Sequence, residues 1–218
     1  MRARGTRLVA LLVGLGLGVT EASAIRPADE AIFPAADYTS AEGRALAEAH
    51  GPQLEALYDD VRRCAPELDF QLDGIAFQRS KRVPGGAHHL TLWVWLDPGR
   101  PPLGRDTAAR ATAAFRQYGQ RLARRLVGRE PVAADARVGG YGLILTWLGP
   151  RKIKDTPVAE SLVVFSRKDE VTAFAGGQTE APTFLAASEV RAFDGQTEVP
   201  FPPLAVQEVP GPAGLDGC

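Results

Sequence analysis

Apolar residues recur at steps of three and four between residues 39 and 64, which is the spacing of one face of an α-helix. The stripe consists of Leu46, His50, Leu54, Leu57, Val61 and Cys64. Thr39 and Glu42 have the spacing of a capping box, so we expect the helix to begin there. Gly51 and Pro52 interrupt the stripe and predict a kink or two consecutive helices.

Two segments with the period of a β-strand follow. Leu68, Phe70 and Leu72 alternate with polar residues. Asp73-Gly74 then breaks the alternation, which predicts a β-bulge. Residues 88–97 form a second alternating run, and the short loop between the two runs favours an antiparallel hairpin.

The longest predicted helix covers residues 105–127. Its buried stripe consists of Ala108, Ala111, Phe115, Tyr118, Leu122 and Leu126. Two strands, apolar on both sides, are predicted at residues 139–149 and 158–166. The order α-β-β-α-β-β, followed by a mixed C-terminal section, predicts an α+β fold. We expect an antiparallel four- to five-stranded sheet with helices packed mainly on one face.

A near-repeat occurs in the last quarter of the chain, where AFAGGQTEAP at residues 173–182 resembles AFDGQTEVP at residues 192–200. In the first copy Gly176-Gly177 is typical of a helix end. In the second copy Asp194-Gly195 is the preferred pair for a two-residue hairpin turn. The shared letters therefore predict two different backbones, and we interpret them as turn chemistry rather than as a repeated binding element.

The N-terminus has the three-part pattern of a secretory signal. Three arginines precede an uninterrupted apolar run at residues 8–19, and Ala22 and Ala24 then have the small-x-small spacing of a cleavage site. Twelve apolar residues are too few to cross about 30 Å of hydrocarbon. We therefore expect export to the periplasm or beyond, with cleavage near Ala24 and no transmembrane segment in the mature chain.

These features divide the chain into four parts: a signal peptide at residues 1–24, an irregular leader at 25–38, a single α+β domain at 39–198, and a Pro/Gly-rich tail at 199–218. Cleavage removes three of the 25 basic residues and one of the 26 acidic residues, which leaves a net charge of −3. This charge gives no signal for nucleic acid binding.

The two cysteines, Cys64 and Cys218, remain in the mature chain. In an oxidising compartment they can form one disulfide that ties the tail to the first helical region. The alternative is a buried Cys64 and a free thiol in the tail.

Aromatic and histidine side chains gather on the second predicted strand. Alternation places His89, Trp93 and Trp95 on one face, and Tyr141 and Trp147 share a face of the third strand. Aligned indoles can stack on sugar rings or line an apolar groove. The alternative is that helices cover this face and that the rings belong to the core.

Motifs of several enzyme classes are absent from the sequence, including serine-hydrolase elbows, phosphate-binding loops and paired cysteine motifs. His88 and His89 are adjacent, so in a strand they point to opposite faces and are poorly placed to bind one metal ion. We expect them at the surface or at a loop end, and we expect neither a metal site nor a cofactor.

The long helix is rich in arginine. Seven arginines between residues 105 and 129 face only one aspartate in the helix, and Arg110, Arg121 and Arg124 lie opposite its apolar stripe at 100° per residue. We call these three residues the basic helix face. Such a face could meet an anionic envelope component or an acidic protein, although a solvated basic surface is the simpler interpretation.

We therefore expect an exported, non-catalytic domain that binds a partner or supports an envelope assembly. Its candidate binding residues are Arg110, Arg121, Arg124, Trp93, Trp95 and His89. The alternative is an exported hydrolase-type enzyme that uses His89 with an acid such as Asp97 or Glu160.

Overall fold

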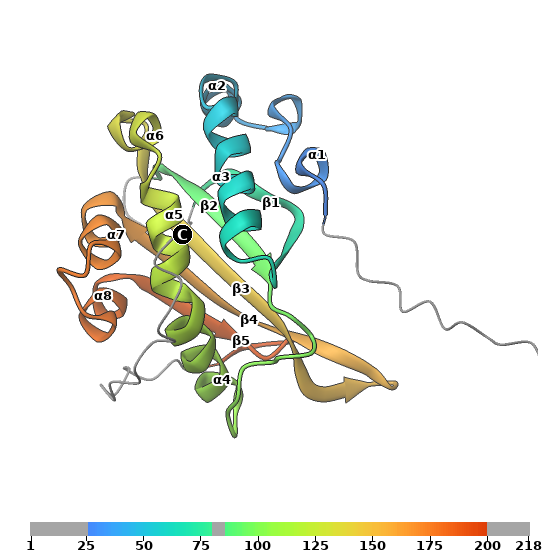
Figure 1. The fold of residues 1–218 in the computed structure, drawn as a ribbon. Coiled ribbons are helices and arrows are strands. Elements are labelled where there is room, and N and C mark those ends of the chain that lie inside the picture. Colours follow the sequence, from blue (N-terminus) through green and yellow to red (C-terminus); the bar gives the residue numbers. More distant parts are fainter. Residues whose placement is uncertain (1–25, 80–85, 200–218) are drawn as a thin grey trace, which may run out of the picture.

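The structure is a computed structural model that describes residues 26–79 and 86–199. A six-stranded sheet in the order β1-β2-β3-β4-β5-β6 forms its base, with helices packed over it (Figure 1). The fold is α+β, as the sequence predicts. Within the described ranges no helix is long and apolar enough to cross a membrane.

The sheet is mixed rather than antiparallel. β1 (Asp69–Arg79) and β2 (His88–Trp95) form the predicted antiparallel hairpin, and its register shifts between Phe70 and Ile75 around the predicted bulge. β2 then pairs with β3 (Val138–Ile153) in parallel, so the prediction of an antiparallel sheet is wrong at this pair. The helical connection between the two strands is long enough for the crossover that a parallel pair requires.

The remaining strands are antiparallel. β4 (Thr156–Arg167) pairs with β3 and with β5 (Glu189–Phe193), and the two-residue β6 (Glu198–Val199) closes the edge. The sheet therefore has six strands where four or five were predicted.

Two consecutive helices begin the domain, as Gly51-Pro52 predicts: α2 (Ala41–Ala49) and α3 (Gly51–Cys64). The N-cap of α2 is Ser40 rather than Thr39, because the Ser40 Oγ accepts a hydrogen bond from the backbone N–H of Gly43 at 3.1 Å. The apolar stripe of both helices, including Cys64 at the end of α3, is buried.

The long helix contains a π-helical turn in its middle. α4 (Thr107–Ala114) continues through the π-turn η2 (Phe115–Gly119) into α5 (Gln120–Val127). A Cβ at Gly119 would lie 2.7 Å from the ring of Phe115, so the glycine makes room for that ring. The ring stacks with Phe174 and Phe184 beneath it.

The near-repeat forms two different structures, as predicted. Its first copy ends α7 (Lys168–Ala175), which is followed by α8 (Ala181–Ala187). Its second copy ends β5 and turns into β6, and the Asp194 carboxylate accepts the backbone N–H groups of Gln196 and Thr197. The hairpin loop therefore has four residues, at 194–197, where two were predicted.

Residues 26–38, predicted to be an irregular leader, contain the short helices α1 (Ala28–Ala31) and η1 (Ala35–Asp37). The segment is fastened to β1: Ile32 bridges Ile75, and the backbone N–H of Phe77 donates to the Tyr38 hydroxyl at 2.7 Å. Residues 26–38 therefore pack along the outer edge of β1.

The two faces of the sheet have different environments. One face of the sheet packs against the helices, and the two layers together form the main hydrophobic core. α6 (Glu130–Ala134) contributes Val132 to this core. The other face carries a separate apolar cluster made by strands alone. We call this surface the open face, and it consists of Trp93, Ile144, Val163, Phe165 and Phe193.

Candidate functional site

The open face runs across four neighbouring strands, β2 to β5. Ile144, Val163 and Phe165 form its centre, and Trp93 and Phe193 pack against them while remaining partly exposed. No described helix contributes to this cluster. The cluster is therefore a continuous apolar strip on one side of the sheet, with a centre that is 6–8% exposed and with Trp93 and Phe193 partly exposed beside it.

Glycines of β3 let side chains lie flat on this face. A Cβ at Gly140 would approach the His89 ring to 2.8 Å, and a Cβ at Gly142 would approach the Phe165 ring to 2.6 Å. The His89 and Phe165 rings meet edge to face with their centroids 5.4 Å apart. The rings of His89 and Phe165 thus occupy the space that side chains at these two glycines would fill. The sequence gives no clear signal for this role of the glycines.

The indole N–H groups on β2 already have partners within the sheet. Trp93 donates to the Thr146 hydroxyl at 2.8 Å, and Trp95 donates to the Gln71 side-chain oxygen at 2.6 Å. Both rings are partly exposed. Each tryptophan therefore offers a ligand its ring face rather than its hydrogen-bond donor.

Two hollows adjoin the tryptophans. A pocket of about 290 Å³ lies beside Trp93, between the β1 bulge and the segment that carries Phe33 and Tyr38. A wider hollow of about 590 Å³ lies beside Trp95 and is lined by Glu67, Asp97 and their neighbours. Both border the β1 edge, so the aromatic row on β2 has recesses along one side.

His89 belongs to this face, but no carboxylate and no nucleophile of the described residues forms a hydrogen bond with its ring. Its side chain is buried, its Nδ1 lies 3.1 Å from the carbonyl oxygen of Ala87, and Nε2 has no hydrogen-bond partner. Burial lowers the pKa of His89, and Glu189 is the carboxylate that opposes this effect. His88 and His89 were expected at the surface or at a loop end. The surface position is wrong, because both are buried, whereas His88 does lie at a loop end as the first residue of β2.

The two acids named with His89 have other contacts. Glu160 accepts two hydrogen bonds from Arg110 and one each from Trp147 and Thr107. Asp97 accepts the backbone N–H of Gly99. The structure thus places neither acid in a hydrogen bond with His89.

Trp147 and Tyr141 do not extend the aromatic row of β2. Both are buried in the main core beneath the helices, on the side of the sheet opposite the open face. The aromatic side chains of the two strands therefore contribute to different surfaces.

The basic helix face is largely engaged by contacts within the chain. Arg110 is buried in its ion pair with Glu160. Arg121 pairs with Glu67 and lies over the Tyr118 ring, with its guanidinium carbon 5.2 Å from the ring centroid. Arg124 is exposed, although its Nε donates to the Ala175 carbonyl at 2.9 Å. The three arginines therefore do not form one solvated surface. The prediction that Arg110 belongs to an exposed basic face is wrong, because its side chain is buried.

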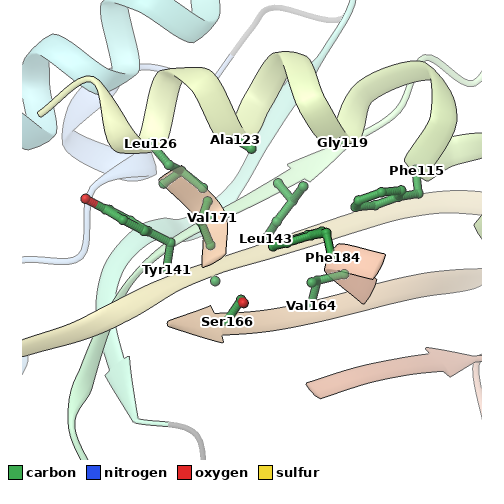
Figure 2. A pocket seen from close by; sticks show the side chains of 11 residues that line it. Phe115, Gly119, Ala123, Leu126, Tyr141, Leu143, Val164, Ser166, Val171 and Phe184 are labelled. Carbon is green, nitrogen blue, oxygen red and sulfur yellow. The ribbon is translucent and has the colours of Figure 1, made fainter. Parts of the chain in front are cut away.

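A small cavity lies between the long helix and the sheet (Figure 2). Its volume of about 10 Å³ is at the lower limit for one water molecule. The Ser166 hydroxyl at its wall is buried without a hydrogen-bond partner, and Figure 2 shows the Tyr141 hydroxyl directed away from the other lining side chains. The cavity therefore has no room for an organic ligand.

A metal site and a disulfide each require specific side chains that the fold brings together. Within residues 26–79 and 86–199 no group of three His, Cys, Asp or Glu side chains is arranged to hold a metal ion. Cys64 is buried, and that part of the chain has no free cysteine. Cys218 lies outside the described residues, as does the expected cleavage site at Ala24.

Comparison with known proteins gives no relative: no protein-family model, no curated protein and no solved structure matches the chain.

Proposed function

We propose that the chain is exported and acts as a binding domain whose open face takes up an apolar surface of a protein partner. The signal pattern at residues 1–24 supports export. The observation that carries the binding proposal is the apolar cluster that strands alone build on the side of the sheet away from the main core. Such clusters on a sheet normally pack against a second layer.

The chemistry of the open face favours an apolar protein over a glycan. Sugar recognition requires hydrogen-bonding groups around the aromatic ring, but the Trp93 indole N–H is donated to the Thr146 hydroxyl, and Thr146 itself is buried. Thr91, the next polar side chain along β2 on this side, is fully buried and bonds a backbone carbonyl. Apolar contact with the rings is the interaction that these groups leave available.

The rim of the open face carries little charge that is available for steering. Arg191 lies 3.6 Å from Glu189, and its guanidinium carbon lies 5.2 Å from the Phe193 ring centroid. Because apolar burial is not screened by salt, binding at this face should persist at high ionic strength. Binding by Arg121 and Arg124 would weaken under the same conditions.

A site-specific photo-crosslinker tests the proposal. Benzoylphenylalanine would replace Phe193 on the open face and, as a matched control, Leu103, which is apolar and 84% exposed but lies outside that face. We expect irradiation of the exported protein in its producing cells to give a defined protein adduct at position 193 and none at position 103. Adding Trp93→Ser should reduce the adduct at least tenfold, because truncating an aromatic residue that anchors an interface typically costs about 2 kcal/mol of binding.

Three results would count against the proposal. The first is equal or absent adducts at positions 193 and 103. The second is an adduct with twice the mass of the chain, which would identify self-association instead of a different partner. The third is binding that disappears in 1 M salt and in the Arg121→Glu/Arg124→Glu variant, which would indicate that the basic helix face binds the partner.

A further inference from the structure

A serine, a histidine and a glutamate meet at the end of the sheet where β2 begins. The Ser40 hydroxyl oxygen lies 3.4 Å from Nε2 of His88, and the other ring nitrogen, Nδ1, lies 3.4 Å from a carboxylate oxygen of Glu42. Ser40 and Glu42 belong to the start of α2, whereas His88 is the first residue of β2. We call these three residues the nucleophile cluster.

The hydrogen-bonding capacity of the three groups is mutually consistent. Ser40 Oγ accepts the Gly43 N–H with one lone pair, which leaves its own proton free to be donated to His88. If His88 accepts at Nε2, its proton is on Nδ1, the nitrogen that faces Glu42. Nδ1 is buried and makes no hydrogen bond, so a small movement of the Glu42 side chain, 43% exposed, would complete the chain of contacts.

The surroundings of His88 keep its ring neutral. Burial is the largest cause that lowers the pKa of His88, Arg79 lowers it further, and Glu42 raises it. Arg79, opposite His88 on β1, also binds the Glu42 carboxylate at 2.5 Å. Two further titratable groups lie nearby: the neighbouring His89, and Arg137, which precedes β3 and interacts electrostatically with Glu42. A neutral imidazole can take a proton from a serine.

Ser40 also stands where negative charge is stabilised. It is the N-cap of the nine-residue helix α2, and its side chain is partly exposed. The first N–H groups of a helix have no acceptor within the helix, and the helix dipole is positive at this end. An oxyanion formed next to Ser40 Oγ would therefore lie near backbone donors.

We propose that Ser40, His88 and Glu42 form a serine-nucleophile site that hydrolyses carboxylic esters. This activity goes beyond the proposed binding function and uses none of the residues of the open face. Ser40 and His88 are its catalytic residues, and Glu42 is a positioning residue that orients His88. The arrangement has the roles of a Ser-His-acid triad, in which geometry rather than sequence order identifies the members.

The reaction proceeds in two balanced halves. Ser40 Oγ attacks the ester carbonyl carbon while its proton moves to His88 Nε2; the bond to the alcohol oxygen then breaks, and that oxygen takes the proton from His88. Water next attacks the acyl-Ser40 carbonyl, giving a proton to His88. The bond to Ser40 breaks, and the proton returns to Ser40 Oγ, so one ester and one water give one acid and one alcohol.

The test uses the mature chain with two probes, p-nitrophenyl acetate turnover and covalent labelling by a fluorophosphonate. Ser40→Asn is the decisive variant, because asparagine also caps helices and so keeps the start of α2 while removing the nucleophile. We expect labelling of the peptide that contains Ser40, and loss of labelling with at least a hundredfold lower turnover in Ser40→Asn. Ser188→Ala, a serine whose hydroxyl bonds the Phe184 carbonyl, should retain both.

Two substitutions separate positioning from folding through the pH profile. Glu42→Gln removes the group that raises the pKa of His88, so the acid limb of turnover should move to lower pH while kcat falls more than KM changes. Arg79→Gln removes a group that lowers this pKa, so the limb should move to higher pH. Absence of fluorophosphonate labelling, equal labelling of the folded Ser40→Asn variant, or shifts of the same sign in both variants would overturn the proposal.

Discussion

Arg110 donates hydrogen bonds from Nε and from a terminal nitrogen to the two carboxylate oxygens of Glu160, at 2.7 and 2.6 Å, with both side chains buried. The pair joins α4 to β4. Thr107 and the indole of Trp147 supply the remaining hydrogen bonds to the carboxylate, and the Gly104 carbonyl accepts another from Arg110. The helix is thereby fixed on the sheet by a satisfied polar contact at the margin of the apolar core.

Arg110→Ala should therefore destabilise the fold strongly. Removing one partner leaves the Glu160 carboxylate buried without its counter-charge, which typically costs about 3–5 kcal/mol. Arg124→Ala is the matched control, because that side chain is exposed and its contribution should stay within about 1 kcal/mol. Urea unfolding followed by circular dichroism measures both. A similar free energy of unfolding for the two variants would contradict a structural role for the buried pair.

Local periodicity predicts most elements of this fold but not the direction in which β2 and β3 pair. The split between α2 and α3 and the β1 bulge are predicted because glycine and proline act within one turn of the chain. The parallel pairing depends on where the chain returns after the long helix. Side-chain alternation along a strand is the same in either direction, so it contains no such information.

The candidate residues show the same limit. A helical wheel places Arg110 away from the apolar stripe and so predicts an exposed side chain. In the structure Arg110 is buried, because its guanidinium forms an ion pair with Glu160 on β4. Ser40 and His88 are separated by 48 positions, and no local pattern links them. Contacts between distant segments can be found only when the topology is known. The open face was missed for the same reason, because its residues come from four strands.

Gly140→Ala should destabilise the sheet. A Cβ at this position would lie 2.0 Å from the backbone oxygen of Ser166 on the neighbouring strand, and backbone cannot move aside cheaply. Overpacking of this kind typically costs about 1–3 kcal/mol. Gly51→Ala is the control, since nothing lies within 4 Å of a Cβ there and alanine favours the helix. Thermal unfolding should show a lower midpoint for Gly140→Ala only; an unchanged midpoint would show that the strands can separate without penalty.

We predict that Cys64 and Cys218 pair in the mature protein. Cys64 is buried at the end of α3, and a disulfide to the last residue would close a long loop, which can stabilise the fold by up to about 4–5 kcal/mol. Thiol titration of denatured, unreduced protein should find no free thiol, and the Cys64→Ser/Cys218→Ser variant should unfold at a lower urea concentration. Two titratable thiols would exclude the bond.

Export makes a direct prediction about the mature N-terminus. N-terminal sequencing of the protein from periplasm or medium should begin close to Ile25, because Ala22 and Ala24 form the cleavage pattern. Ala24→Arg should leave the precursor uncleaved, since the peptidase requires a small residue there, whereas Ala36→Arg lies far from the pattern and should not affect cleavage. An intact Met1 in the exported wild-type protein would refute the prediction.

Two of the buried histidines, His88 and His89, should make the fold less stable in mild acid. Burial lowers the pKa of both His88 and His89 below the ordinary value of 6.5, so below pH 6.5 the unfolded chain binds protons that the folded chain does not. The contribution of the two histidines to the free energy of unfolding should therefore be fully present above pH 6.5. It should decrease from there towards pH 5, by at most about 1.4 kcal/mol per pH unit for each histidine. Urea unfolding at pH 7.5, 6 and 5 measures this slope.

His89→Gln should reduce the slope without abolishing it, because His88 still titrates. Asp135 does not confound this window: its hydrogen bonds with Arg137 and His50 lower the pKa of that carboxyl, so its contribution is present above pH 3.8 and is lost only below it. A slope that is the same in wild type and His89→Gln would show that the ring accepts its proton in the folded state, and thus that its burial does not oppose protonation.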